Sequence, residues 1–126
     1  MDVSVVIPLY NESESIITLG EEIISICQEN NFLAEIIFIN DGSSDDSWSK
    51  IKEMQVKKYN NIFFRGINFR KNLGKSNGLN QGFKYAMGKV VITMDADLQD
   101  DPIEIPKFVD AILNKEFDLV SGWKKN

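Results

Sequence analysis

Two aspartates that directly follow a short apolar run are the residues best suited to chemistry. Asp95 and Asp97 are followed by Gln99, and the run before them predicts a buried parallel strand. If the chain stays extended there, the three side chains point to the same side. Carboxylate and amide oxygens suit a hard divalent cation, Mg²⁺ or Mn²⁺, that also binds phosphate oxygens. The alternative is a solvated polar loop in which Asp100 or Asp101 only caps the next helix.

Composition limits the class of protein. The chain has 126 residues, 43% of them hydrophobic and 26% charged, which is typical of one globular domain. A net charge of −5 argues against nucleic acid or an anionic membrane surface as the main partner. Histidine is absent from the sequence, which excludes histidine-based triads, histidine general bases and the usual zinc sites.

The single cysteine and the lack of long apolar runs indicate a compartment. Cys27 excludes an internal disulfide and lies in a helical apolar pattern, so we expect it to pack in the core. The first residues lack the basic region of a signal peptide, and no apolar run reaches the length of a membrane span. These features predict a cytoplasmic location.

Strands and helices alternate along the whole sequence. Short β-branched runs predict strands, and apolar residues spaced three or four apart predict helices between them. This order predicts a three-layer α/β fold, a mainly parallel sheet with helices on both faces. The expected strands are 3–7, 35–39, 61–68, 89–94 and 117–122, and the apolar faces of the expected helices are Ile16, Leu19, Ile23, Ile24 and Cys27; Trp48, Ile51 and Met54; Leu79, Phe83, Ala86 and Met87; and Phe108, Val109, Ile112 and Leu113.

Helix ends can also be predicted. Asn11 or Ser13 is expected to cap the first helix, and Ser44 or Asp45 the second. Gly88 is expected to end the third helix, because glycine tolerates the backbone conformation found there. The last helix is expected to begin near residue 106, where a proline fits the first turn.

Four loops follow the first four strands and should meet at one edge of the sheet. Tyr10 offers an aromatic face there, and Asp41 offers a carboxylate that accepts hydrogen bonds from a base or a sugar. Arg70, Lys71 and Lys75 bring positive charge for phosphate. Taken singly, each has a structural interpretation: a packing ring, a turn residue before a glycine, and solvated charges.

Four sequence motifs occur in order and cover nearly the whole chain. They are Val5-Val6-Ile7-Pro8-Leu9-Tyr10-Asn11-Glu12, Ile39-Asn40-Asp41-Gly42-Ser43-Ser44-Asp45, Asn72-Leu73-Gly74-Lys75 with Gly82, and Asp95-Ala96-Asp97-Leu98-Gln99-Asp100. In this combination the chain resembles the family 2 glycosyltransferases. Within that family it is most similar to the type that includes dolichol-phosphate-mannose synthase and bactoprenol glucosyltransferase.

The resemblance implies a GT-A fold whose N-terminal half binds a nucleotide-sugar and a divalent metal. It implies that Pro8, Tyr10 and Glu12 line the nucleoside pocket and that Asp41 meets the base. The resemblance also places Arg70 and Lys75 near the base or the diphosphate. It places Asp95 near the ribose or the metal, with Asp97 and Gln99 as metal ligands.

The resemblance also implies an activity. Members of the family invert the sugar as they transfer it in one step, here from UDP or GDP to a polyprenyl phosphate. Relatives continue past the position of Asn126, so we expect residues 1–126 to be the donor-binding part, with the acceptor-binding part and any catalytic base beyond it.

Two alternatives to this activity remain open at this point. The chain could be a non-catalytic nucleotide-binding module, or a receiver domain phosphorylated at Asp41 or Asp95. An open sheet that exposes apolar surface would also favour a homodimer.

Overall fold

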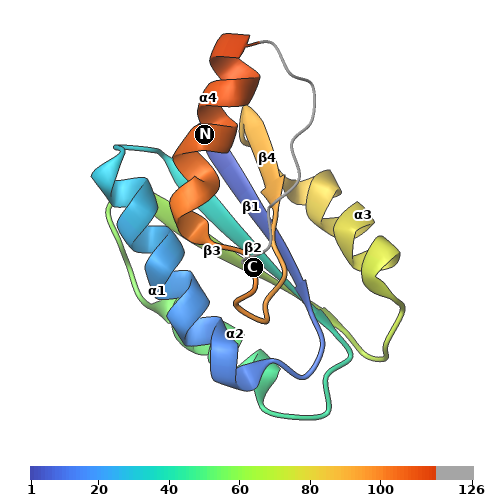
Figure 1. Ribbon diagram of the computed structural model, residues 1–126. Helices are drawn as coiled ribbons and strands as arrows, with labels where there is room; N and C mark the ends of the chain where they lie inside the picture. Colours follow the sequence, from blue (N-terminus) through green and yellow to red (C-terminus); the bar gives the residue numbers. More distant parts are fainter. Residues whose placement is uncertain (116–126) are drawn as a thin grey trace.

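Four parallel strands form the centre of the molecule (Figure 1). The computed structural model describes residues 1–115. The sheet has the order β3-β2-β1-β4, and each strand pairs in parallel with its neighbours. In chain order the elements are β1 (Val3–Leu9), α1 (Ser13–Glu29), β2 (Ala34–Asp41), α2 (Ser47–Val56), β3 (Ile62–Phe69), α3 (Lys75–Tyr85), β4 (Val90–Thr93), the 3₁₀ turn η1 (Pro102–Glu104) and α4 (Ile105–Lys115).

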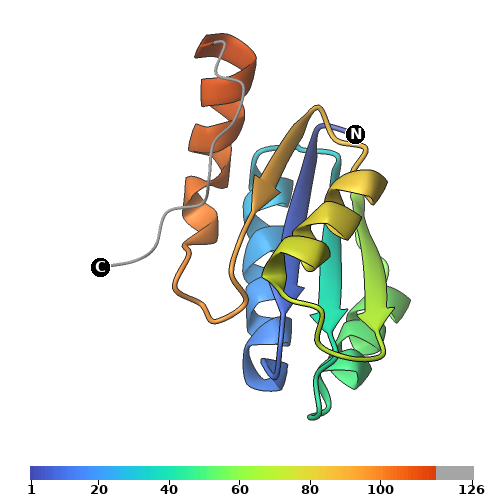
Figure 2. The same ribbon diagram turned by 90° about the vertical axis from the view of Figure 1, so that its right-hand side faces the viewer.

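Helices cover both faces of the sheet, because alternate residues of the buried strands point to opposite sides. Helices α1, α2 and α4 pack on one face, where Val5 and Phe38 belong to the larger apolar core. Helix α3 lies alone on the other face in the described part of the chain, over Val6, Ile37 and Ile39 (Figure 2). The expected three-layer α/β class is confirmed.

Two glycines bring α3 close to the sheet, where Leu79 and Ala86 of the expected apolar face pack as predicted. A Cβ atom on Gly82 would lie 2.3 Å from Cγ1 of Val6, so the helix backbone rests almost directly on β1. Gly78 is buried one turn earlier. The expected apolar face is therefore partly wrong: Phe83 and Met87 are 45% and 68% exposed, because close approach at the glycines turns them away from the sheet.

Helix α3 also ends earlier than expected, at Tyr85 rather than at Gly88. The backbone N–H of Met87 donates to Oε2 of Glu35 at 2.6 Å, and that of Gly88 donates to Oγ of Ser4 at 2.8 Å. Ser4 in turn donates to Glu35, whose side chain is buried at the amino ends of the strands. These bonds replace the helical hydrogen bonds that a longer α3 would need.

The other element bounds agree closely with expectation. Strands β3 and β4 lie within one residue of the predicted ends, and α4 begins one residue before Pro106. The expected strand at 117–122 lies outside the described residues. No helix within residues 1–115 has the length and apolar character needed to span a membrane.

Candidate functional site

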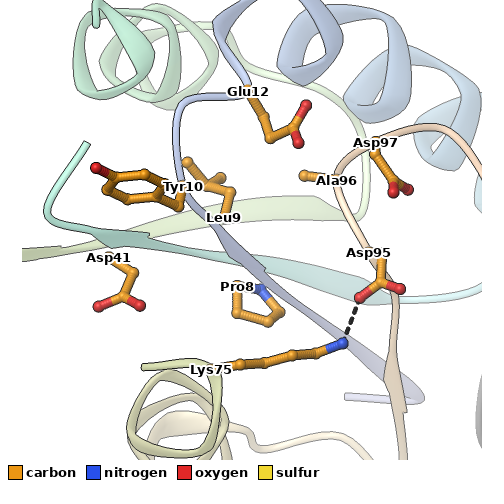
Figure 3. A pocket seen from close by; sticks show the side chains of 9 residues that line it. All are labelled: Pro8, Leu9, Tyr10, Glu12, Asp41, Lys75, Asp95, Ala96 and Asp97. Carbon is orange, nitrogen blue, oxygen red and sulfur yellow. Dashed lines mark hydrogen bonds and ion pairs between the residues drawn. The ribbon is translucent and has the colours of Figure 1, made fainter. Parts of the chain in front are cut away.

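The carboxyl ends of the strands point to one edge of the sheet, where their loops enclose a pocket of about 330 Å³ (Figures 2 and 3). A volume of this size lies at the lower end of the range for small-molecule sites. Its position matches the rule that ligands of open α/β sheets bind outside the carboxyl ends of the strands. The lining residues are Pro8, Leu9, Tyr10, Glu12, Asp41, Lys75, Asp95, Ala96 and Asp97.

The pocket has two chemically different sides (Figure 3). Tyr10 and Asp41 lie on one side, and the half-exposed tyrosine presents its ring. Glu12, Asp95 and Asp97 gather on the other side. One side therefore offers an aromatic surface with a hydrogen-bond acceptor, and the other offers carboxylate oxygens for a cation.

Asp41 is buried and anchors the loop between β3 and α3. Its Oδ1 accepts a hydrogen bond from the backbone N–H of Leu73 at 2.7 Å, and its Oδ2 accepts one from that of Gly74 at 3.0 Å. Gly42 follows with the positive φ of 71° that the sequence predicts for this turn. The aspartate thus fixes the start of α3, from which Lys75 enters the pocket.

Asn11 joins the loop after β1 to the loop after β2. Its φ is 52°, and its Oδ1 accepts a bond of 2.8 Å from the backbone N–H of Ser44 and one of 3.3 Å from that of Asp45. The N–H of Asn11 donates to Oγ of Ser43 at 2.9 Å, and that of Glu12 donates to Oγ of Ser47 at 3.1 Å. These bonds hold the segment that carries Tyr10 and Glu12 against the loop after β2 and the start of α2.

The expected caps at these two loops are wrong. Glu12 and Asp46 occupy the N-cap positions of α1 and α2, and neither caps its helix through its side chain. Asp45 instead accepts bonds from the backbone and hydroxyl of Ser47 and from the backbone N–H of Ser13. Burial raises the pKa of the Asp45 carboxyl, but the hydrogen bonds with Ser47 and Ser13 together outweigh it and bring the pKa below its ordinary value.

The chain does not remain extended through the acidic motif. Strand β4 ends at Thr93, and Leu98 takes a left-handed conformation with a φ of 65°. The backbone N–H of Gln99 donates to Oδ1 of Asp97 at 3.1 Å, which closes a turn that strand alternation does not foresee. Asp95 and Asp97 still line one pocket, but Gln99 is exposed and outside the lining.

Two further residues of the acidic loop have structural contacts. Oδ2 of Asp100 accepts a bond of 2.7 Å from the backbone N–H of Asp95. Asp101 caps η1, since its side chain accepts from the N–H of Ile103. Arg70 and Lys71 are exposed and do not line the pocket, so the role of Arg70 beside a base or diphosphate stays a prediction.

The charge distribution of the pocket suits a divalent cation. Burial raises the pKa of the Glu12 carboxyl, and the negative charges of Asp97 and Asp45 raise it further, against a smaller opposing hydrogen bond with Ser15. In residues 1–115, no three cysteine, aspartate or glutamate side chains converge to enclose a metal. The oxygen donors of Asp95 and Asp97 suit a hard cation such as Mg²⁺, which keeps waters and takes substrate phosphates as further ligands.

Three residues lie in the loops expected here but have no expected role in the pocket. Leu9 and Ala96 line the pocket through their positions beside Tyr10 and between the two aspartates. Asn11 is expected only as a cap, although asparagine next to a strand end is a common signal for a left-handed residue. The position of Ala96 between two aspartates that share the pocket is the signal that could have found it.

A family model supplies the decisive comparison. The model described as "Glycosyl transferase family 2" matches residues 4–125. The chain belongs to this family. The match leaves the receiver-domain alternative without support, and the resemblance stated from the four motifs is confirmed.

Similar curated proteins have polyprenyl phosphates in their names. The chain is 40% identical over 124 residues to an undecaprenyl-phosphate 4-deoxy-4-formamido-L-arabinose transferase of Proteus mirabilis. It is 31% identical over 126 residues to a dodecaprenyl-phosphate galacturonate synthase of Rhizobium johnstonii. These matches cover 98% and 100% of the chain but only 37% of each relative. The family 2 chain thus spans just over a third of the length of these proteins.

Solved structures show the same fold. Staphylococcus aureus TarS 1-349 in complex with UDP-GlcNAc has a TM-score of 0.68 at 21% identity, covering 91% of the chain and 32% of that structure. The mannosyltransferase PcManGT of Pyrobaculum calidifontis, in complex with GDP-Man and Mn²⁺, has a TM-score of 0.55 at 22% identity over 75% of the chain and 27% of that structure. At these identities the likeness establishes the fold of the family 2 chain.

Proposed function

We propose that residues 1–126 form the donor-binding part of a glycosyltransferase that transfers a hexose from a UDP- or GDP-sugar to a polyprenyl phosphate. The observation that carries this proposal is the convergence, in one pocket at the strand ends, of an aromatic face, an acceptor carboxylate and an acidic pair. The names of the curated relatives support the acceptor class. The whole protein would then work at the cytoplasmic face of the membrane, where such lipids present their phosphate.

The two sides of the pocket suggest how a donor would lie. The ring of Tyr10 would stack on the base, and Asp41 would accept a hydrogen bond from an N–H on its edge. Lys75, between the two sides, would pair with the diphosphate. Pro8 and Glu12 would complete the nucleoside wall, and Arg70 would approach from outside.

Asp95 and Asp97 would hold Mg²⁺ or Mn²⁺, with Gln99 joining them after a rearrangement of its turn. Bound there, the ion would act as a Lewis acid that stabilises negative charge on the leaving diphosphate. The carboxylates themselves orient the donor by fixing its phosphate end, while the Tyr10 side fixes the base. This arrangement leaves the sugar at the open side of the pocket.

The proposed transfer is a single inverting displacement. An oxygen of the acceptor phosphate forms a bond to the anomeric carbon, and the bond from that carbon to the diphosphate oxygen breaks. The electron pair of the broken bond leaves with the nucleoside diphosphate. A phosphate acceptor is already ionised at neutral pH, so it needs little help from a general base.

Calorimetry of the chain with UDP and with GDP, each in the presence of Mn²⁺, tests the donor site. We expect one of them to bind, and Asp97→Ala to remove the dependence of that binding on Mn²⁺. Asp46→Ala is the matched control, because it removes the same charge from an exposed N-cap outside the pocket. Absence of binding by both nucleotides, or unchanged metal dependence in Asp97→Ala, would contradict the proposal.

A second assay separates an enzyme from a non-catalytic nucleotide-binding module. The chain is incubated with radiolabelled nucleotide-sugars and a polyprenyl phosphate, and the organic phase is counted. Labelled lipid shows transfer, whereas nucleotide binding without labelled lipid favours the module for these residues.

A further inference from the structure

One ion pair differs from the others in residues 1–115. The Nζ of Lys75 lies 2.6 Å from Oδ1 of Asp95, and the two residues are 20 positions apart in the sequence. The other ion pairs of this part of the chain, Lys50 with Glu53 and Lys107 with Glu104, join residues three positions apart. Figure 3 shows the Lys75 side chain crossing the pocket from α3 to the acidic side.

The position of this ammonium conflicts with a cation on the same carboxylate. Mg²⁺ binds carboxylate oxygens at about 2.1 Å, so an ion on Asp95 would lie within a few ångströms of Nζ. Two positive groups at that separation repel each other strongly in a partly shielded pocket. Lys75 and the metal therefore compete for Asp95.

The lysine is the partner that can move. Its side chain is 61% exposed and has a flexible four-carbon stem, whereas the Asp95 side chain is 22% exposed. The backbone N–H of Asp95 is held by Asp100, and the amides just before Lys75 are held by Asp41. With both backbones fixed, the ammonium can swing within the pocket while its carboxylate partner stays in place.

We propose that the Lys75 ammonium pairs with Asp95 when no metal is bound, and that it moves to pair with the donor's diphosphate when the metal binds. This inference rests on the proposed function. It makes metal and nucleoside diphosphate bind cooperatively, because each removes a partner that opposes the other. It also keeps the charge of Asp95 balanced before the donor arrives.

The test compares two lysine variants of the same helix by their affinity for Mn²⁺ alone, measured by electron paramagnetic resonance. Lys75→Met keeps the length of the stem and removes the competitor, so we expect Mn²⁺ to bind about three- to tenfold more tightly than in the wild type. Lys84→Met is the matched control, because Lys84 is exposed near the other end of α3 and its removal changes the net charge equally. We expect Mn²⁺ affinity in Lys84→Met to stay within about twofold of the wild type.

The sign of the effect should reverse with nucleotide. With Mn²⁺ present, we expect Lys75→Met to bind UDP or GDP about tenfold more weakly than the wild type, because the phosphate has lost its ammonium partner. Asp95→Asn added to Lys75→Met should abolish the gain in Mn²⁺ affinity. Circular dichroism of each variant confirms that it is folded.

The outcomes separate this inference from the proposed function. If Lys75→Met binds Mn²⁺ no more tightly than Lys84→Met, or if neither binds it, the competition is refuted even where nucleotide binding persists. If Lys75→Met gains Mn²⁺ affinity but neither UDP nor GDP binds any variant, the competition at Asp95 stands, while transfer to a diphosphate and the proposed function both fail.

Discussion

Replacing Asn11 tests whether the bridge between the first two loops positions the pocket. Asn11→Ala removes the acceptor for the two backbone N–H groups of Ser44 and Asp45 and places alanine at a φ of 52°. Each exposed hydrogen bond contributes about 0.5 kcal/mol, and the left-handed backbone costs alanine about 1 kcal/mol. We therefore expect the free energy of unfolding to fall by about 2 kcal/mol.

Two further variants separate these contributions. Asn11→Gly loses the same hydrogen bonds without the backbone strain, so it should lose only about 1 kcal/mol. Asn31→Ala imposes the strain alone, because Asn31 has a φ of 57° at the end of α1, far from the pocket. It should also lose about 1 kcal/mol, with no change in nucleotide affinity.

The assays are urea unfolding followed by circular dichroism and calorimetry with UDP or GDP and Mn²⁺. Both Asn11 variants should bind nucleotide about tenfold more weakly. Their first loop is no longer held in place, so binding must fix the positions of Tyr10 and Glu12 at a cost in entropy. The reasoning is refuted if Asn11→Ala loses the expected stability and keeps wild-type nucleotide affinity. Equal losses of stability in Asn11→Ala and Asn11→Gly would show that the left-handed backbone contributes nothing.

Two remaining predictions concern the core. Gly82→Ala should lower the free energy of unfolding by about 1–3 kcal/mol, because its methyl group would overlap Val6. Gly78→Ala should be nearly neutral, because its methyl group would lie 3.3 Å from Cβ of Pro8. Equal urea midpoints for the two variants would contradict this. Burial raises the pKa of the Cys27 thiol from 9.0 to about 12, so a thiol reagent at pH 8 should label the folded chain only as fast as it unfolds. By the same shift, the contribution of Cys27 to stability is complete below pH 9.0 and is lost as the pH rises towards about 12, where denaturant titrations of the wild type should show a fall that Cys27→Ala lacks. Rapid labelling of the native protein would contradict the assignment.

The order of elements and most of the pocket could be predicted, and both follow from periodicity. Buried runs such as that around Ile36 appear as strands, and parallel strands bring their following loops to one edge. For this reason Tyr10, Asp41, Lys75 and Asp97 were expected together and are found together. The alternation of strands and helices is enough to predict this arrangement.

What could not be predicted depends on single backbone conformations and close contacts. The left-handed turn at Leu98 takes Gln99 away from the pocket that Asp95 and Asp97 line, and a leucine carries no sequence signal for such a turn. Helical periodicity counts large apolar residues, so it predicts Leu79 correctly but places Phe83 on the sheet in place of Gly78 and Gly82. The end of α3 depends on Glu35, which is distant in sequence and buried only in the folded chain.

The two hydrogen bonds that Asp41 accepts from Leu73 and Gly74 fix the backbone just before Lys75. In the proposed donor site, the carboxylate that would meet the base therefore also determines where the lysine for the diphosphate begins. Any substitution of Asp41 would therefore alter discrimination between nucleobases and the placement of Lys75 together. A change of base preference in this chain is better sought at neighbouring positions that leave this carboxylate in place.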